Sequence, residues 1–201
     1  MKNYVFIDNQ KIELTNEQAK SLKEYLSFPE MKLADIPQGE TFKIGKHEFI
    51  VLEQSGETTV VIRKDLLPDM EFGSNNDYNG SKVDEACNKF AEEISNAVGE
   101  ENIVIHTVDL TSNDGMKDYG KVERRCSLIT AELYRRYVEI LDKFKAGDWW
   151  WLSTPFSTKK HENDSWIHCV SPSGGINFHH CHYVGGVRPF CILKSTIFVS
   201  K

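Results

Sequence analysis

The chain has 201 residues, of which 40% are hydrophobic and 11% aromatic, and its formal net charge is -6. This length allows one sizeable domain, or one domain with a small appendage, and the hydrophobic content excludes wholesale disorder. The acidic balance argues against a general nucleic-acid binder, because such a protein needs a basic surface to displace counterions from phosphates.

The first thirty residues are predicted to form a small ββα appendage. Residues 4–7 are β-branched or aromatic, polar and apolar residues alternate in 11–14, and the Asp8-Asn9 pair between them is typical of a hairpin turn. Residues 15–18 form a capping box, which predicts a helix. Its apolar stripe is Ala19, Leu22, Tyr25 and Leu26. A linker that begins at Pro29 separates this unit, residues 1–30, from a second unit, residues 40–201.

The second unit begins with strands. Segments 42–44, 47–52 and 58–62 are rich in β-branched and aromatic residues and are separated by glycine-containing turns, so three strands are predicted. Ser81 is placed to cap a helix that ends at Gly99, and a further strand follows at 103–105.

Residues 109–127 are expected to be a long polar connection. Its first part, 109–115, resembles a calcium loop but has Asp114 and Gly120 where a glycine and a glutamate are required. We therefore expect an Asx turn there. Beyond it, Thr130 is placed to cap a second helix that ends at Gly147.

The last quarter contains three successive tryptophans, a hairpin predicted over 166–178 and a strand predicted over 190–199. Strands and helices thus occur in mixed order, and the predicted class is α+β. Strand alternation places Trp149 and Trp151 on one face and Trp150 on the other, mostly in the core. Arg188, beside Pro189, is expected to make a semi-buried ion pair with Asp148 or Asp109; the alternative is that it grips an anionic ligand. The structural residues are therefore Trp149, Trp150, Trp151, Arg188 and Pro189.

The five cysteines are an odd number, and charged residues interrupt the early apolar stretch, so a signal peptide is not expected. This combination predicts free thiols in a reducing compartment, and we expect a cytoplasmic protein. A membrane-spanning segment is not expected either, because the apolar stretches are too short.

Four segments carry a family resemblance: Phe49–Leu52, Leu133–Tyr137, Trp150–Leu152 with Thr154-Pro155, and Gly186–Pro189. Over residues 40–201 the chain resembles an uncharacterised domain family that is common in phages and prophages and is related to the C-type-lectin-like fold. The resemblance implies a small twisted, mostly antiparallel sheet with two helices, and loops that present a variable ligand surface. Family members are usually non-catalytic binders. The calcium motifs of sugar-binding lectins and the reactive cysteine pair of the fold's small enzyme branch are missing.

The histidines and cysteines of the last quarter have a composition that zinc would accept. They are His168, Cys169, His179, His180, Cys181 and His182. Neighbouring residues of a strand point to opposite faces, so these side chains are not expected to converge on one ion. We therefore predict buried cysteines, exposed histidines, and neither a metal nor a cofactor.

Catalytic signatures are weak. A thiolate at Cys126, with His47 or His106 as its base, is conceivable because Arg124 and Arg125 precede it, but no motif fixes that geometry. We accordingly expect a protein without enzyme activity.

The function expected is binding of a protein partner by a protein of phage or mobile-element origin, for example an inhibitor of a host defence protein. The alternatives are a tail or fibre component of the virion, and a zinc-dependent enzyme or zinc-stabilised fold. The oligomeric state is left open. The expected binding surface comprises His168, Ser171, Ser173, Asn177, His179, His180, His182 and Tyr183, together with Lys159, Lys160, His161, Glu162, Asn163 and Asp164.

Overall fold

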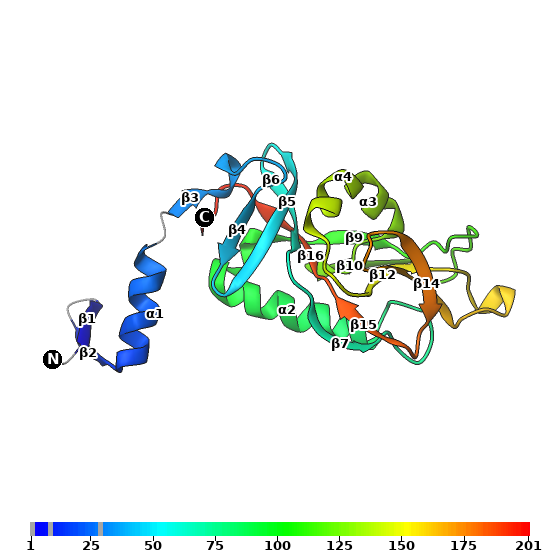
Figure 1. Ribbon diagram of the computed structural model, residues 1–201, viewed down its shortest axis with the longest axis horizontal. Helices are drawn as coiled ribbons and strands as arrows, with labels where there is room; N and C mark the ends of the chain where they lie inside the picture. The colour runs from blue at the N-terminus through cyan, green and yellow to red at the C-terminus, as the bar shows by residue number, and fades with distance from the viewer. Residues whose placement is uncertain (1–2, 8–9, 28–29) are drawn as a thin grey trace.

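A computed structural model describes residues 3–7, 10–27 and 30–201, with the backbone alone for 6–7 and 23–27 (Figure 1). The fold is α+β, as predicted: mostly strands in curled antiparallel sheets, with a few helices. Within the described residues, no helix is long and apolar enough to cross a membrane. The predicted turn at Asp8-Asn9 and the linker residue Pro29 lie outside the described residues.

The N-terminal unit has the predicted ββα order. Strands β1 (Asn3–Ile7) and β2 (Gln10–Leu14) pair antiparallel, and helix α1 (Asn16–Ser27) follows. The capping box is present, because the Gln18 amide donates to Thr15 Oγ1 at 3.1 Å and the Thr15 amide donates to Gln18 Oε1 at 2.9 Å. Figure 1 shows this unit standing apart from the rest of the chain.

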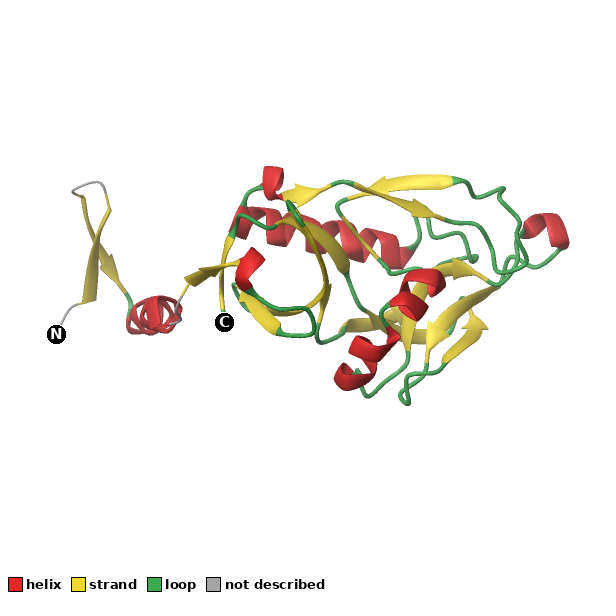
Figure 2. Ribbon diagram, turned by 90° about the horizontal axis from the view of Figure 1, so that it is seen from above, coloured by secondary structure: helices red, strands yellow, loops and turns green. Residues whose placement is uncertain are grey.

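The larger sheet is antiparallel and curls round on itself (Figure 2). Its main path runs β11-β16-β6-β5-β4-β17-β3, and β8 pairs with β16. The strands are β3 (Glu30–Lys32), β4 (Thr41–Ile44), β5 (His47–Ser55), β6 (Thr58–Arg63), β8 (Ile103–Val104), β11 (Cys126–Ser127), β16 (Phe190–Lys194) and β17 (Phe198–Ser200).

Strand β5 separates two apolar cores. Phe49 and Val51 belong to one core, and Ile50 and Leu52 to the other. Alternation explains this division, since successive side chains of a strand point to opposite faces. A strand buried on both faces is apolar without interruption, which is why this run is so uniform.

The smaller sheet has the order β14-β13-β12-β15-β7. Trp150 of β12 pairs with Gly186 of β15 in parallel, while β12–β13, β13–β14 and β15–β7 are antiparallel. The terminal strand on one side is β14. The strands are β7 (Leu67–Glu71), β12 (Trp150–Pro155), β13 (Trp166–Val170), β14 (Ile176–His180) and β15 (Val184–Val187).

Helix α2 (Lys82–Val98) contacts strands of both sheets (Figure 1). It begins as predicted, where Ser81 Oγ accepts the Asp84 amide at 3.2 Å, and ends at Gly99, whose φ is 87°. The apolar stripe is buried, and burying each large side chain contributes about 1.5–3 kcal/mol. Its buried apolar residues are Val83, Cys87, Phe90, Ala91 and Ile94.

The second predicted helix is interrupted. Thr130 caps α3 (Ala131–Arg136), with the Leu133 amide 3.1 Å from its hydroxyl. At Tyr137 the backbone leaves the helical region, with φ -106° and ψ 12°, and the chain continues as α4 (Val138–Leu141) and the 3-10 turn η3 (Asp142–Phe144). Three further 3-10 turns are η1 (Leu33–Asp35), η2 (Glu100–Asn102) and η4 (Lys159–His161).

The connection over 109–127 is partly regular. β9 (His106–Asp109) and β10 (Lys121–Arg124) pair antiparallel, with Val108 opposite Val122. The prediction missed this hairpin because its strands are short and carry mostly polar side chains. The Asx turn is confirmed, since the Thr111 amide donates to Asp109 Oδ1 at 2.9 Å.

Two of the five cysteines are not free. Cys126 and Cys191 are register partners on β11 and β16, with Cα atoms 4.6 Å apart, and form a disulfide. The prediction of five free thiols is therefore wrong. Pairing between strands brought together residues that are 65 positions apart in sequence. Cys87, Cys169 and Cys181 are free and buried.

Candidate functional site

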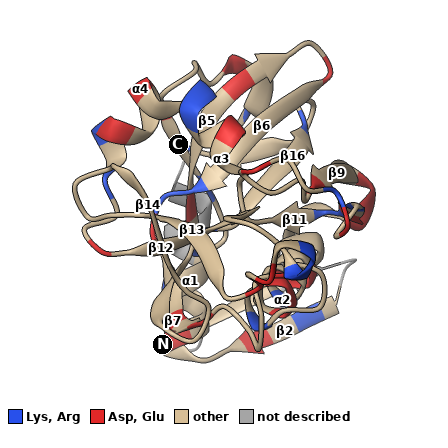
Figure 3. Ribbon diagram, turned by 90° about the vertical axis from the view of Figure 1, so that its right-hand side faces the viewer, with Lys and Arg blue, Asp and Glu red and all other residues tan. Residues whose placement is uncertain are grey.

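The β13–β14 hairpin forms one end of the smaller sheet, and its register sorts the side chains onto two faces. Trp166 lies opposite His180, and His168 opposite Phe178, on one face; Ile167 lies opposite His179 on the other. Strands β12, β13 and β14 are tan in Figure 3 because they contain no Lys, Arg, Asp or Glu.

Aromatic rings form two arms, one on each face of β14, which together we call the aromatic rim. In one arm Trp166 meets Phe178 at 5.7 Å and His180 at 5.8 Å between ring centroids, and His180 meets His182 at 5.0 Å. In the other arm His179 lies between Trp149, at 4.7 Å, and Tyr183, at 5.3 Å. The rim is thus Trp149, Trp166, Phe178, His179, His180, His182 and Tyr183.

The rim is open to solvent at its large apolar rings. Trp166, Phe178 and Tyr183 are exposed by 37%, 43% and 60%. Below the second arm is a pocket of about 230 Å³. Its lining residues are Trp149, Trp150, Trp151, Cys169, His179, Tyr183, Val184 and Gly185.

Trp150 and Trp151, which lie beneath the rim, are buried, as the alternation of side chains along a strand predicts. Trp150 packs into one core, while Trp151 packs into another, with Trp149 partly buried against it. The Trp151 indole donates to the Met70 carbonyl at 2.9 Å. A Cβ added to Gly185 would lie 3.1 Å from the Trp151 ring, so a glycine lets β15 approach the indole closely.

Arg188 is buried, but its partners are not the predicted carboxylates of Asp148 or Asp109. Its guanidinium donates to the carbonyls of Arg63, Lys64 and Phe144 at 2.9–3.0 Å and lies 5.2 Å from the Trp150 ring centroid. Burial lowers the pKa of Arg188 to about 10. The backbone of Pro189 also helps to hold the strands, since its carbonyl accepts the Arg63 amide at 2.8 Å. Arg188 therefore pins three chain segments together, and the ion-pair prediction is wrong.

His168 does not belong to an exposed surface, so this part of the predicted binding surface is wrong. It is only 5% exposed, and its Nδ1 donates to the Thr154 carbonyl at 3.1 Å. Burial lowers the pKa of His168. The register places His168 opposite Phe178, and the Phe156 ring stacks over the imidazole. The sequence did not show this stacking.

The polar residues at the 171–177 end of the hairpin form hydrogen bonds with neighbouring residues of the chain. Ser171 Oγ accepts the Gly175 amide at 3.1 Å and lies 2.9 Å from Ser173 Oγ. Asn177 Oδ1 accepts the Phe178 amide at 2.8 Å. Ser173 and Asn177 are exposed, but this turn lies at the opposite end of β14 from His179 and His180.

The predicted segment 159–164 folds against another loop. Asp114 accepts hydrogen bonds from Ser112, from Ser157 Oγ at 2.6 Å and from His161 Nδ1 at 2.8 Å. These hydrogen bonds hold the pKa of Asp114 well below its usual value, and the bond from Ser112 has the largest effect on it. Thr158 Oγ1 donates to Asp118 at 2.8 Å. The exposed residues Lys159, Lys160, His161 and Glu162, with the half-buried Asn163 and Asp164, thus form part of a separate loop cluster.

Asn76 is a positioning residue that sequence reasoning missed. Its buried amide donates to the carbonyls of Ser157 and Trp166 at 3.0 and 2.8 Å, and its oxygen accepts from Tyr119 at 2.7 Å. It therefore ties the loop cluster to the start of β13. The exposed rings of Trp166 and Phe178 were also missed, although aromatic residues on the outer face of a polar hairpin are a usable signal.

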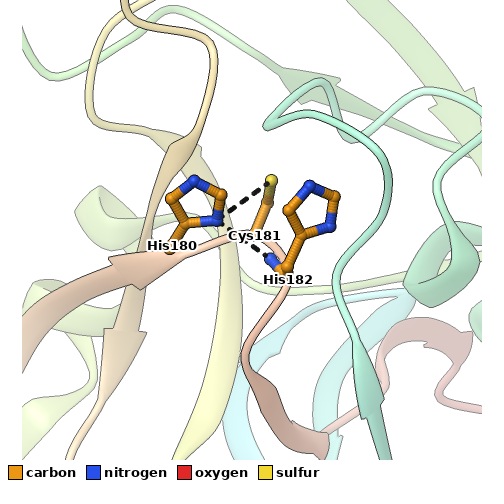
Figure 4. A group of neighbouring side chains, drawn as sticks. All are labelled: His180, Cys181 and His182. Atoms are coloured by element: carbon orange, nitrogen blue, oxygen red, sulfur yellow. Dashed lines mark hydrogen bonds between the residues drawn. The ribbon is translucent and has the colours of Figure 1, made fainter.

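His180, Cys181 and His182 come together where β14 ends (Figure 4). The Tyr183 amide donates to the His180 carbonyl at 2.9 Å, which closes a turn. Strand alternation therefore stops at His180, and the prediction that neighbouring side chains diverge is wrong for these three. Burial, and then the carboxylates of Asp164 and Glu71, raise the pKa of the Cys181 thiol.

A thiolate at Cys126, which the sequence left as a weak alternative, is excluded by its disulfide with Cys191. His106 Nε2 does lie 2.9 Å from Ser127 Oγ. The Ser127 hydroxyl also donates to the Leu128 carbonyl at 3.0 Å. Burial lowers the pKa of His106 to about 4. This pair therefore links β9 to β11.

Comparison of the chain with family models, with curated proteins and with solved structures finds no match.

Proposed function

We propose that this chain is a non-catalytic binding protein that contacts a protein partner through the aromatic rim. The observation that carries the proposal is the set of exposed rings at the end of the smaller sheet, Trp166, Phe178 and Tyr183. Apolar rings gathered at one place on a surface are typical of interaction sites, and Trp and Tyr contribute most of the energy in many protein interfaces.

The support beneath the rim is closely packed and hydrogen-bonded. Trp150 and Trp151 are almost fully buried, and Arg188 binds three carbonyls behind them. A surface whose backbone is already ordered loses little conformational entropy on binding. The three strands under the rim carry no formal charge, which matches the depletion of charged residues at the centre of interfaces.

A protein partner fits this surface better than nucleic acid. The chain is acidic overall, and the carboxylates of Glu71 and Asp164 act electrostatically on Cys181, in the turn that follows β14. A phosphate backbone would be repelled by these charges. Uncharged aromatic rings beside them suit a partner with an apolar centre and a basic margin.

We further infer a phage or mobile-element origin, a C-type-lectin-like arrangement of residues 40–201 and a role in the bacterial cytoplasm, for example inhibition of a host defence protein. The support is the family resemblance and the way its two C-terminal motifs meet. Trp150 of the first motif is the register partner of Gly186 of the second, so they form one structural unit. Neighbouring genes test the origin: lysogeny and defence genes favour this role.

The test is capture of a partner by immobilised wild-type protein and by single variants of the rim. Phe178→Ala and Tyr183→Ala remove exposed rings, and Phe198→Ala is the matched control because Phe198 is 58% exposed on the larger sheet. We expect one partner, captured from host lysate by the wild type and by Phe198→Ala, to be lost with either rim variant. Capture that is equal for all four proteins would contradict the proposal.

A virion component is the second candidate, and the ββα unit favours it. Figure 1 shows this unit apart from the main body. In a virion component it would act as a docking element. Recovery of the chain from purified particles, together with binding to isolated cell envelopes and none to lysate proteins, would support this candidate over a cytoplasmic inhibitor.

A further inference from the structure

Among the described residues, one group combines imidazole and thiol ligands at metal-binding distance. One ligand atom each from His180, Cys181 and His182 lie within 4.8 Å of one another (Figure 4). We propose that these three side chains bind one divalent cation of the zinc type and leave one coordination position open.

The donor set determines the class of metal. Zinc and cobalt accept thiolate sulfur together with imidazole nitrogen, whereas calcium and magnesium require oxygen ligands. Two imidazoles and one thiol therefore select a transition metal of borderline softness. Zinc sites with three protein ligands keep their fourth position for water or for a bound molecule.

The spacing of the ligand atoms is close to what a tetrahedral site needs. His180 Nδ1 lies 4.0 Å from Cys181 Sγ. Zinc–ligand bonds of about 2.0 and 2.3 Å at a tetrahedral angle place a nitrogen and a sulfur about 3.5 Å apart. Rotation of the side chains closes this difference and releases the long hydrogen bond, 3.4 Å, that His180 Nδ1 accepts from the His182 amide. The His182 imidazole is exposed, and its ring centroid lies 5.0 Å from that of His180.

The backbone at the site is held in place before any metal binds. The Cys181 amide donates to the Ser165 carbonyl at 2.7 Å, and the Cys181 carbonyl accepts the Phe72 amide at 2.9 Å. These bonds join the turn to two other segments, so the buried sulfur has a fixed position. His180 is half-buried and His182 is exposed, which gives an ion access from solvent.

The charges around the turn favour a cation in part. The carboxylates of Asp164 and Glu71 act electrostatically on Cys181, and Glu71 also interacts electrostatically with His182. Glu71 is also paired with Lys82, which offsets one of the two negative charges. The net field from these groups is therefore weakly attractive, and most of the affinity must come from the three ligands.

Cobalt binding tests the site directly. Protein without a histidine tag, with its Cys126–Cys191 disulfide intact, is stripped of metal by a chelator that is then removed, and is titrated with Co²⁺. We expect about one Co²⁺ per chain, tetrahedral d–d bands and a sulfur-to-cobalt charge-transfer band, and displacement of these bands by Zn²⁺. Cys181→Ser should abolish the charge-transfer band. His182→Ala should weaken binding by about tenfold or more, since even outer-shell partners of a metal matter to this extent.

Two control variants remove the same kinds of side chain at positions away from the proposed metal site. Cys169→Ser removes another buried thiol, and His161→Ala removes another exposed imidazole; both should bind Co²⁺ as the wild type does. His182→Ala decides the outcome even if Cys181→Ser fails to fold, because His182 is exposed. Absence of a saturable band in the wild type, or unchanged affinity in His182→Ala, would overturn the proposal. Partner capture is a separate measurement, so failure here leaves the proposed function standing.

Discussion

Strands β5 and β14 both carry large apolar side chains but differ in what those side chains do. β5 lies inside the larger sheet, and Phe49 and Ile50 are buried in cores on its opposite faces. β14 is a terminal strand, and its Phe178 is half exposed. The position of a strand in its sheet, more than its residue types, decides whether an aromatic side chain supports the fold or is available for contact.

The largest expected difference is in the stability lost when a buried indole, rather than a rim indole, is removed. Trp150→Ala should lower the free energy of unfolding by about 3–5 kcal/mol, because it leaves a cavity in a packed core. Trp166→Ala, at the rim, should cost about 1 kcal/mol or less. Urea unfolding followed by circular dichroism measures both. Similar losses for the two variants would remove the distinction between supporting and exposed aromatic residues.

Loss of the Arg188 guanidinium should rank next. Arg188→Met leaves three carbonyls without this donor and should destabilise the fold by about 3 kcal/mol, since each buried group that loses its partner costs about 1–3 kcal/mol. Arg135→Met, at an exposed position, is the control and should change stability by about 0.5 kcal/mol or less. If Arg188→Met proved as stable as the control in urea unfolding, these hydrogen bonds would be easily replaced by water.

A smaller effect is expected at Gly186. A Cβ there would lie 2.4 Å from Leu66 Cδ1, so Gly186→Ala should cost about 1–3 kcal/mol through overpacking. Leu66→Ala removes the clash, and the double variant should be more stable than the sum of the single variants predicts. Gly175→Ala, which meets only Ser171 Oγ at 3.5 Å, is the control. Strict additivity in this double-mutant cycle would argue that β15 is displaced in some other way.

The smallest effect is a pH dependence in the loop cluster. The pKa of Asp114 is depressed in the folded state by its hydrogen bonds and is about 3.9 when the chain is unfolded. Its contribution is therefore fully present at neutral pH, declines as the pH falls below about 4, and is lost as the pH falls through the folded pKa. Urea midpoints of wild type and Asp114→Asn should converge as the pH is lowered. A gap that stays constant with pH would exclude this linkage.

Local patterns in the sequence predicted the local structure well. Ser81, Thr130 and the 15–18 box were identified as helix caps, and alternation placed Trp150 and Trp151 on opposite faces. These features depend on residues within a few positions of one another, whose hydrogen bonds and directions follow from the backbone geometry.

Features that depend on distant segments could not be predicted in the same way. The Cys126–Cys191 disulfide requires the pairing of β11 with β16, and the burial of His168 requires Phe156 to cover it. The convergence at Cys181 was missed for a local reason, because the turn after His180 has neither glycine nor proline to mark it.

The hydrogen bond from the Phe178 amide to Asn177 Oδ1 has a consequence for how β14 meets another molecule. A foreign strand that extended the sheet here would first have to displace this side chain, at a cost of about 1 kcal/mol, the usual net strength of one such bond. The terminal strand is thereby partly protected against uncontrolled polymerisation of copies. A partner at this end of the molecule would instead contact the exposed rings of the aromatic rim, whose shape determines which partners fit.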